Sequence, residues 1–136
     1  MLIAYWIVAG LAALIALFAG TVKLARTQEQ LIAMGQKYNE DLKPWQTKVI
    51  GAAEVLGGLG LVVPMLTGIL PVLSPIAGIG IAILQAGAFV THVRRGELKG
   101  LPVNVVIFAL AGAAAVLGFF VVAAQSLSAA TQPTTR

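Results

Sequence analysis

The few residues of this sequence that could do chemistry lie inside or at the ends of long apolar stretches. Glu54 is the most unusual, because it is a single carboxylate within the glycine-rich stretch GAAEVLGGLGLVVP (Gly51–Pro64). A charge at the centre of a bilayer costs about 2.5–3.5 kcal/mol on insertion scales, so a carboxylate there must be paired or protonated, or must serve a function. Lys23 and His92 are the bases that could pair with it, which predicts an acid–base or proton-exchanging site.

The composition indicates that this acid lies in a membrane. Of the 136 residues, 59% are hydrophobic and 10% are charged, whereas a soluble domain has about 25% charged residues. Such a chain cannot cover its own surface with polar groups in water. The length allows about four spans of ~20 residues plus loops. We therefore expect an all-α fold, an integral membrane four-helix bundle.

The spans can be placed from the apolar stretches, which lie at about 2–22, 47–66, 72–93 and 103–124. Together they predict a single four-span transmembrane domain over residues 1–125, followed by a flexible polar tail over 126–136. The first stretch has no basic residues before it, so a signal peptide is the weaker interpretation. Pro44, Pro75 and Pro102 fit the first turns of helices, where a missing N–H costs little.

The long polar segment after the first span (Leu24–Lys48) predicts a short helix that lies along the interface. Its apolar face would consist of Leu24, Leu31, Ile32 and Met34. Aromatic side chains favour the membrane–water boundary, so we expect interface anchors at four positions, which are Tyr5, Trp6, Tyr38 and Trp45.

The basic residues indicate the orientation of the spans. Eight of the nine Lys and Arg residues lie in the loops after the first and third spans, and cytoplasmic loops carry such an excess. We therefore expect loops 23–48 and 94–102 in the cytoplasm, with both termini outside. The net charge of +4 is then a topology signal, which predicts no nucleic acid among the partners. The expected partners are the lipid bilayer and other membrane proteins, with an oligomer left open.

The polar groups of all four spans are expected near the cytoplasmic side. Glu54 lies about five residues into the second span, or roughly 7–8 Å. Gln85 and His92 are seven residues apart, so they share one helix face, with Glu54 between them in depth. Lys23 ends the first span and Asn104 begins the fourth. These residues predict a polar pocket that opens towards the cytoplasmic leaflet.

Small residues indicate where helices approach closely. The first span has a stripe of them at helical spacing, formed by Ala9, Ala13, Ala16 and Gly20. In the second span, Gly57, Gly58 and Gly60 lie within two turns of Glu54. A neighbouring backbone can approach at these glycines, so we expect Glu54 to face the bundle interior rather than lipid.

Each polar residue also has a purely structural interpretation. The acid–base pair could serve only to set helix register and topology, and Lys23 could extend to lipid headgroups. His92 could be an interfacial side chain beside Arg94 and Arg95, and Gln85 could hydrogen-bond between helices. These alternatives remain open at the level of the sequence.

Several chemistries are excluded by the sequence itself. The chain has no cysteine and one histidine, which excludes thiol redox chemistry, iron–sulfur ligation and bis-histidine haem ligation by this chain. Motifs of nucleotide-binding loops, GxSxG hydrolases and HExxH metalloproteases are absent, and no metal-ligand set stands out. We therefore identify no catalytic residue, metal site or cofactor, and expect at most a subunit of an oxidoreductase assembly.

Three segments of the sequence form a combined pattern: GTVKL (Gly20–Leu24), KVIGAAEVLGGLGLVVP (Lys48–Pro64) and AGAFVTHVRRGE (Ala86–Glu97). In combination they resemble the DoxX-like family of small four-helix bacterial membrane proteins, over about Ala9 to Leu117. The resemblance implies a compact bundle in a bacterial inner membrane and, for some members, a link to quinone-coupled or oxidative-stress systems. It marks four family-pattern polar positions, which are Lys23, Glu54, His92 and Glu97.

Three functions are compatible with this pattern. The leading hypothesis is a DoxX-like subunit or accessory factor of a membrane assembly that handles quinone or another lipid. In that case Glu54 and His92 would exchange protons with a headgroup, and Gln85 would orient it. The second is an interaction module without a small ligand. The third is a small proton-coupled multidrug exporter, although such exporters carry their essential acid in the first helix.

Overall fold

Four long helices make up most of the protein. The computed structural model describes residues 1–133 of the 136, and in these residues it contains helices and no strand. The four helices long and apolar enough to cross a membrane are α1 (Leu2–Ala25), α3 (Pro44–Thr67), α4 (Leu73–Arg95) and α5 (Leu101–Thr131). The predicted all-α membrane four-helix bundle is therefore confirmed, and the protein is a multi-pass membrane protein.

The helix boundaries follow local signals in the sequence. α3 begins at Pro44, and Pro102 occupies the first turn of α5, as expected for a residue that lacks an N–H. α3 and α4 end at Gly68 (φ 71°) and Gly96 (φ 69°). Both glycines adopt the left-handed conformation that closes a helix and that other residues rarely adopt.

The C-terminal segment differs from the expected flexible tail over 126–136. α5 continues to Thr131, and within it the Ser126 hydroxyl donates to the Val122 carbonyl at 3.0 Å and the Thr131 hydroxyl to the Leu127 carbonyl at 3.2 Å. Serine and threonine side chains that bond back one turn are compatible with a helix, and alanine favours one. Residues 134–136 of the expected tail lie outside the described residues.

The polar segment after α1 folds into two short helices, α2 (Gln28–Ala33) and the 3₁₀ helix η1 (Lys37–Asp41). A second 3₁₀ helix, η2 (Leu98–Gly100), precedes α5. We call residues 26–43 the strap and the end of the bundle that carries it the loop end. The predicted interfacial helix is shorter than expected: Leu31 is fully buried, but Leu24 belongs to α1 and Met34 is exposed.

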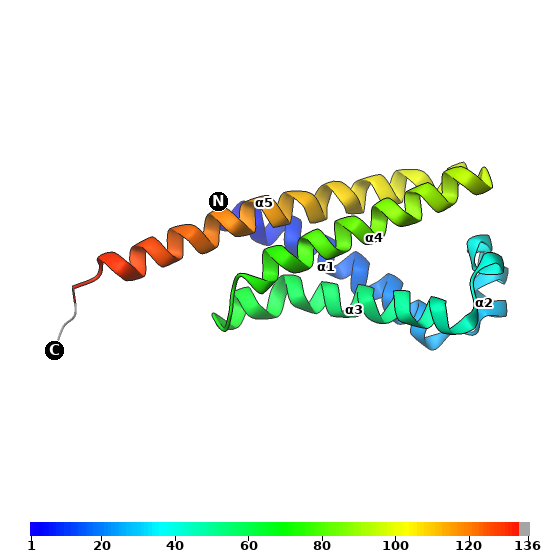
Figure 1. Ribbon diagram of the computed structural model, residues 1–136, viewed down its shortest axis with the longest axis horizontal. Helices are drawn as coiled ribbons and strands as arrows, with labels where there is room; N and C mark the ends of the chain where they lie inside the picture. Colours follow the sequence, from blue (N-terminus) through cyan, green and yellow to red (C-terminus); the bar gives the residue numbers. More distant parts are fainter. Residues whose placement is uncertain (134–136) are drawn as a thin grey trace.

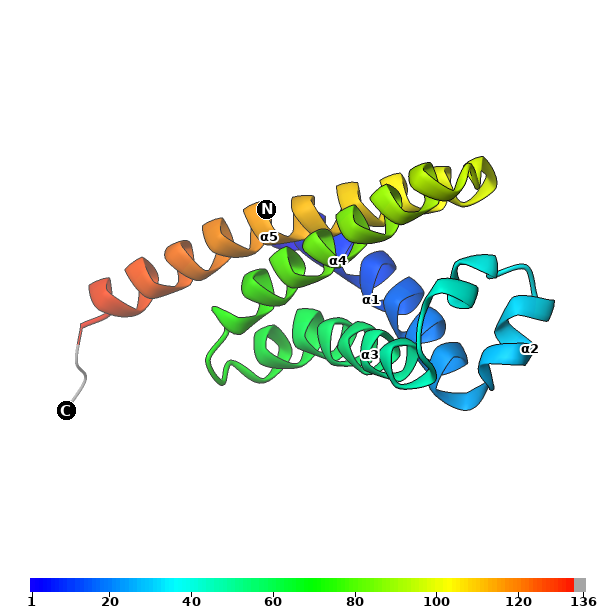
Figure 2. The ribbon, with the colours of Figure 1, turned by 45° about the vertical axis from the view of Figure 1, so that its right-hand side comes forward.

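The four long helices form two pairs that diverge towards the loop end. α1 packs most extensively on α3, and α4 on α5. Figures 1 and 2 show α3 and α4 close together at their connection and separated at the end near α2. The polar side chains discussed below lie in this divergence.

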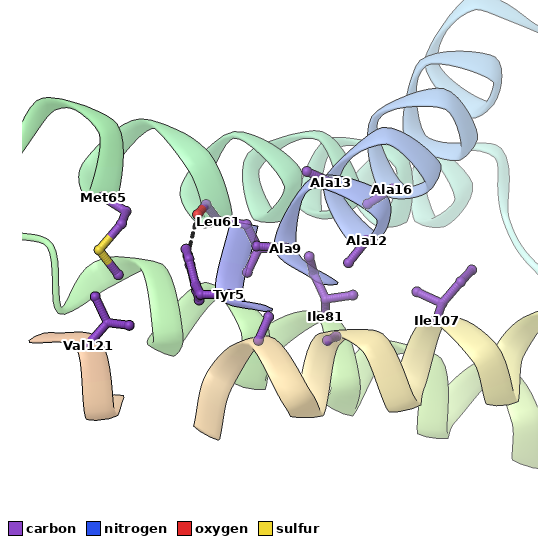
Figure 3. Packing of buried hydrophobic residues seen from close by; sticks show 12 residues of the cluster. Tyr5, Ala9, Ala12, Ala13, Ala16, Leu61, Met65, Ile81, Ile107 and Val121 are labelled. Carbon is purple, nitrogen blue, oxygen red and sulfur yellow. Dashed lines mark hydrogen bonds between the residues drawn. The ribbon is translucent and has the colours of Figure 1, made fainter. Parts of the chain in front are cut away.

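The rest of the bundle is closed by alanines, by larger aliphatic side chains and by Tyr5 (Figure 3). The predicted stripe of α1 is buried in full, and Ala12 joins it. Tyr5, expected at the interface, is instead fully buried, and its hydroxyl donates to the Leu61 carbonyl at 2.5 Å. The Met65 N–H donates to Ser74 Oγ at 3.0 Å. Side chains of α1 and α4 thus satisfy backbone groups next to the intrahelical Pro64, as apolar surroundings require.

Candidate functional site

The centre of the candidate site is an ion pair between α1 and α3. Lys23 Nζ donates to both carboxylate oxygens of Glu54, at 3.1 Å to Oε1 and 2.8 Å to Oε2. The side chains are 8% and 6% exposed. The pair lies at the loop end of both helices. Of the two bases that the sequence offered, the structure therefore pairs Glu54 with Lys23.

Two glycines bring the charged side chains together. Gly20 precedes Lys23 by three residues and Gly51 precedes Glu54 by three, so each glycine lies one turn from its charged residue. A Cβ added at Gly20 would lie 2.6 Å from the Gly51 carbonyl oxygen, and one added at Gly51 would lie 2.9 Å from Lys23 Cβ. The backbones of α1 and α3 can approach this closely only because both residues lack side chains.

The glycines that follow Glu54 also face other helices. A Cβ at Gly58 would lie 3.1 Å from the Ala13 carbonyl oxygen on α1, whereas Cβ atoms at Gly57 and Gly60 would contact Ile81 and Ala77 on α4. Glu54 therefore faces the bundle interior, as the glycine pattern predicted.

His92 forms a second acid–base pair, with Glu97. His92 Nδ1 lies 3.2 Å from Glu97 Oε2, and Arg95 Nε donates to Glu97 Oε1 at 2.8 Å. The hydrogen bond from Arg95, followed by the contact with His92, holds the pKa of the Glu97 carboxyl below its usual value. A neutral imidazole that donates Nδ1–H to this carboxylate leaves Nε2 free to accept a hydrogen bond or a proton.

Two amide side chains lie opposite the first ion pair. Gln85 of α4 is 4% exposed and Asn104 of α5 is 9% exposed. Asn104 Nδ2 is buried without a hydrogen-bond partner in the described part of the chain. Nor does the Gln85 side chain make a hydrogen bond within residues 1–133, so the interhelical bond that the sequence suggested for it is not formed. Buried amides usually have partners, so these two are available to a ligand.

All these polar groups line a hollow at the loop end. One cavity, of about 380 Å³, reaches Ile83 and Ile50 between α3 and α4. An adjoining cavity, of about 780 Å³, reaches Phe18 and Val103 between α1 and α5. We call the two together the polar cavity. Six residues line both of its parts: Lys23, Tyr38, Glu54, Gln85, His92 and Asn104.

Five of these six were expected from depth in the membrane, and Glu97 from the family resemblance. The structure brings the five together around the polar cavity, and Glu97 lines its larger part. No group of three or more His, Cys, Asp or Glu side chains within residues 1–133 could hold a metal ion. The side chains around the polar cavity can donate and accept hydrogen bonds and exchange protons.

Tyr38 is the site residue that the sequence analysis missed. It was expected as an interface anchor, but η1 places its ring against His92, with centroids 5.3 Å apart and planes at 76°. Its hydroxyl donates to Gln36 Oε1 at 3.0 Å, and burial raises the pKa of this phenol. Only the fold of the strap brings Tyr38 to His92, so periodicity could not have found it.

Arg95 holds the strap over the polar cavity. Its guanidinium donates to Glu97 on its own side, and to Glu40 (3.2 Å) and Asp41 of η1. Lys48 secures the other end of the strap, because its Nζ donates to three carbonyl oxygens at the end of α1, those of Lys23, Leu24 and Arg26, at 2.7–2.9 Å. Basic residues that the sequence assigned to topology therefore also have specific structural roles.

In a comparison with protein-family models, residues 7–114 match the model of the DoxX-like family. The matched region contains every residue of the polar cavity named above. Neither the curated proteins nor the solved structures contain a match to this chain.

Proposed function

The chain belongs to the DoxX-like family of membrane proteins, and from this premise we propose that it is a lipid-binding accessory subunit of a membrane assembly. The ligand that best fits the polar cavity is a lipophilic molecule with a hydrogen-bonding headgroup, such as a quinone. The observation that carries the proposal is the Asn104 amide, whose Nδ2 is buried without a hydrogen-bond partner within residues 1–133 and which lines the cavity beside the buried Gln85.

The donors around the cavity suit a headgroup that carries carbonyl oxygens. The two amides can each donate a hydrogen bond, and the Lys23 ammonium has a third proton besides the two that bond Glu54. Carbonyl oxygens of a quinone accept such bonds, and the apolar walls from α3 and α4 suit its ring. Filling the unused donor of Asn104 would recover the free energy lost when a polar group is buried unpaired, about 1–3 kcal/mol.

Proton exchange would fall to the two acid–base pairs. A quinol that is oxidised to a quinone releases two protons and two electrons. His92 could accept a proton at Nε2, because its Nδ1 side is held by Glu97. Glu54 could exchange a second one through Lys23. The electrons would pass to a partner subunit, since this chain has no cysteine and a single histidine.

The proposed setting is a bacterial inner membrane with the loop end in the cytoplasm. This orientation is supported by the excess of Lys and Arg in the loops. A reporter fused after Arg136 should be located outside the cytoplasm. Finding the fused reporter in the cytoplasm would contradict the orientation.

Ligand content after native extraction tests the proposal. The protein should be purified in polymer-bounded native membrane discs, and its quinones and phospholipids quantified against bulk membrane. We expect enrichment of quinone in the wild type and loss of it in the double variant Gln85→Leu/Asn104→Leu. Leucine has a similar volume but cannot form hydrogen bonds. Gln125→Leu, at an exposed position in the C-terminal half of α5, is the matched control.

An equal quinone content in the wild type, the double variant and the control would refute ligand binding at the amides. The melting temperature of each variant must be recorded to show that it remains folded.

A pure interaction module is the second candidate function. It is favoured by the Lys23–Glu54 pair itself, because glycine-mediated contact and a bidentate ion pair are sufficient to set helix register. The same preparation separates the two functions: stoichiometric protein partners without an enriched small molecule would favour the module.

A further inference from the structure

An apolar groove lies between α4 and α5. Gln85 and Asn104 separate it from the polar cavity. The groove has a volume of about 310 Å³ and, apart from Gln85 and Asn104, an apolar lining of Ala86, Phe89, Val90, Val105 and Phe108. The large side chains among these are 38–51% exposed, so they face the lipid in a membrane protein. The groove is therefore accessible from the bilayer.

The groove ends where α4 and α5 come into close contact. Further from the loop end, a Cβ at Gly78 would lie 2.9 Å from the Ala111 carbonyl oxygen and 3.2 Å from Ala115 Cβ. α4 and α5 are therefore in direct backbone contact at that level. Near the loop end, Phe89 and Phe108 line the same seam, and their bulk leaves a groove between the helices.

The groove and the polar cavity share two residues, which are Gln85 and Asn104. We propose that the ligand is a chain-bearing lipid whose headgroup bonds to these amides and whose hydrocarbon chain lies in the α4–α5 groove. This proposal rests on the proposed function and adds the chemical class of the ligand and its direction in the membrane.

The other two openings of the cavity suit a chain less well. The part between α1 and α5 is also lined by Lys37, Lys99 and Glu97. The part between α3 and α4 has the apolar walls that suit the headgroup ring, but the hydroxyl groups of Tyr38 and Thr91 also line it. A hydrocarbon chain gains nothing beside charged or hydroxyl groups, whereas the α4–α5 groove offers aromatic and branched aliphatic contacts alone beyond the amides.

Photo-crosslinking provides the test. The probes are two benzoquinones with the same headgroup, one without a chain and one with a decyl chain that ends in a diazirine. Wild-type protein in lipid nanodiscs should bind both, and the decyl probe should label Phe89, Val105 or Phe108. Ala86→Phe fills the groove, while Ala109→Phe places the same side chain on an exposed position of α5 that does not line it.

We expect Ala86→Phe to weaken binding of the decyl quinone at least about fivefold, because the added ring occupies the space of the hydrocarbon chain. The same substitution should abolish labelling of the groove. Binding of the chainless quinone should stay within about twofold, and Ala109→Phe should behave as the wild type. The groove assignment is wrong if the chainless quinone binds but the decyl probe labels residues outside the groove. It is also wrong if Ala86→Phe and Ala109→Phe bind the decyl probe equally well. In both cases the headgroup site stands. If neither quinone binds the wild type, both proposals fail.

Discussion

The Lys23–Glu54 pair permits a quantitative prediction, because removing either side chain leaves the charge of the other buried and unpaired. Both side chains are less than one-tenth exposed, and breaking a buried pair costs about 3–5 kcal/mol. Glu54→Gln leaves a buried ammonium, and Lys23→Met leaves a buried carboxylate. The double variant removes both charges, and we expect it to recover most of the loss, to within about 1–2 kcal/mol of the wild type.

Unfolding in mixed micelles of increasing SDS fraction measures these free energies, and a double-mutant cycle gives the coupling between the two residues. Lys99→Met is the control, because this exposed lysine has no ion pair within the described residues. Additive single-variant losses would refute the pairing as the reason that both charges are tolerated in the bundle.

Three further predictions follow from individual contacts. Gly51→Ala should destabilise the protein by about 1–3 kcal/mol, since its Cβ would meet α1 at 2.9–3.0 Å, whereas Gly112→Ala, which meets nothing within 4 Å, should be neutral or slightly stabilising by SDS titration. Ser74→Ala should cost about 1–3 kcal/mol, because a buried backbone N–H loses its acceptor; Ser126→Ala is the exposed control, and equal effects would contradict the assignment. Because the pKa of Glu97 is lowered in the folded protein, its stabilising contribution is complete above ~4.3 and is lost as the pH falls below that value. Melting temperatures from pH 7 to 3.5 should show this loss in the wild type but not in Glu97→Gln.

Depth along the helices was sufficient to predict most of the site. A helix rises 1.5 Å per residue, so the position of a polar residue within its span gives its level in the membrane. This placed Lys23, Glu54, Gln85, His92 and Asn104 at one end, where the structure finds them around one cavity. Depth does not give the rotation of a helix about its own axis, so it left open which base pairs with Glu54.

The strap was the least predictable part. The bonds of Lys48 to the end of α1 and of Arg95 to η1, which hold it in place, join residues that are 22 to 55 positions apart. A polar segment without strong periodicity has no local signal for such contacts. Tyr38 was therefore assigned to the interface, and its place beside His92 was found only in the structure.

By itself, the sequence determined that this protein has four membrane-spanning helices and carries an acid and two bases near one end of them. Hydropathy and length are local properties, and they decide whether a segment can span a bilayer. The spans can therefore be predicted without knowledge of the tertiary structure. The tertiary structure decided that Lys23 and not His92 pairs with Glu54, because Gly20 and Gly51 allow α1 and α3 into backbone contact at that level. It also decided that Gln85 and Asn104 are buried between a polar cavity and an apolar groove, with no hydrogen-bond partner in residues 1–133, since that depends on where α4 and α5 separate.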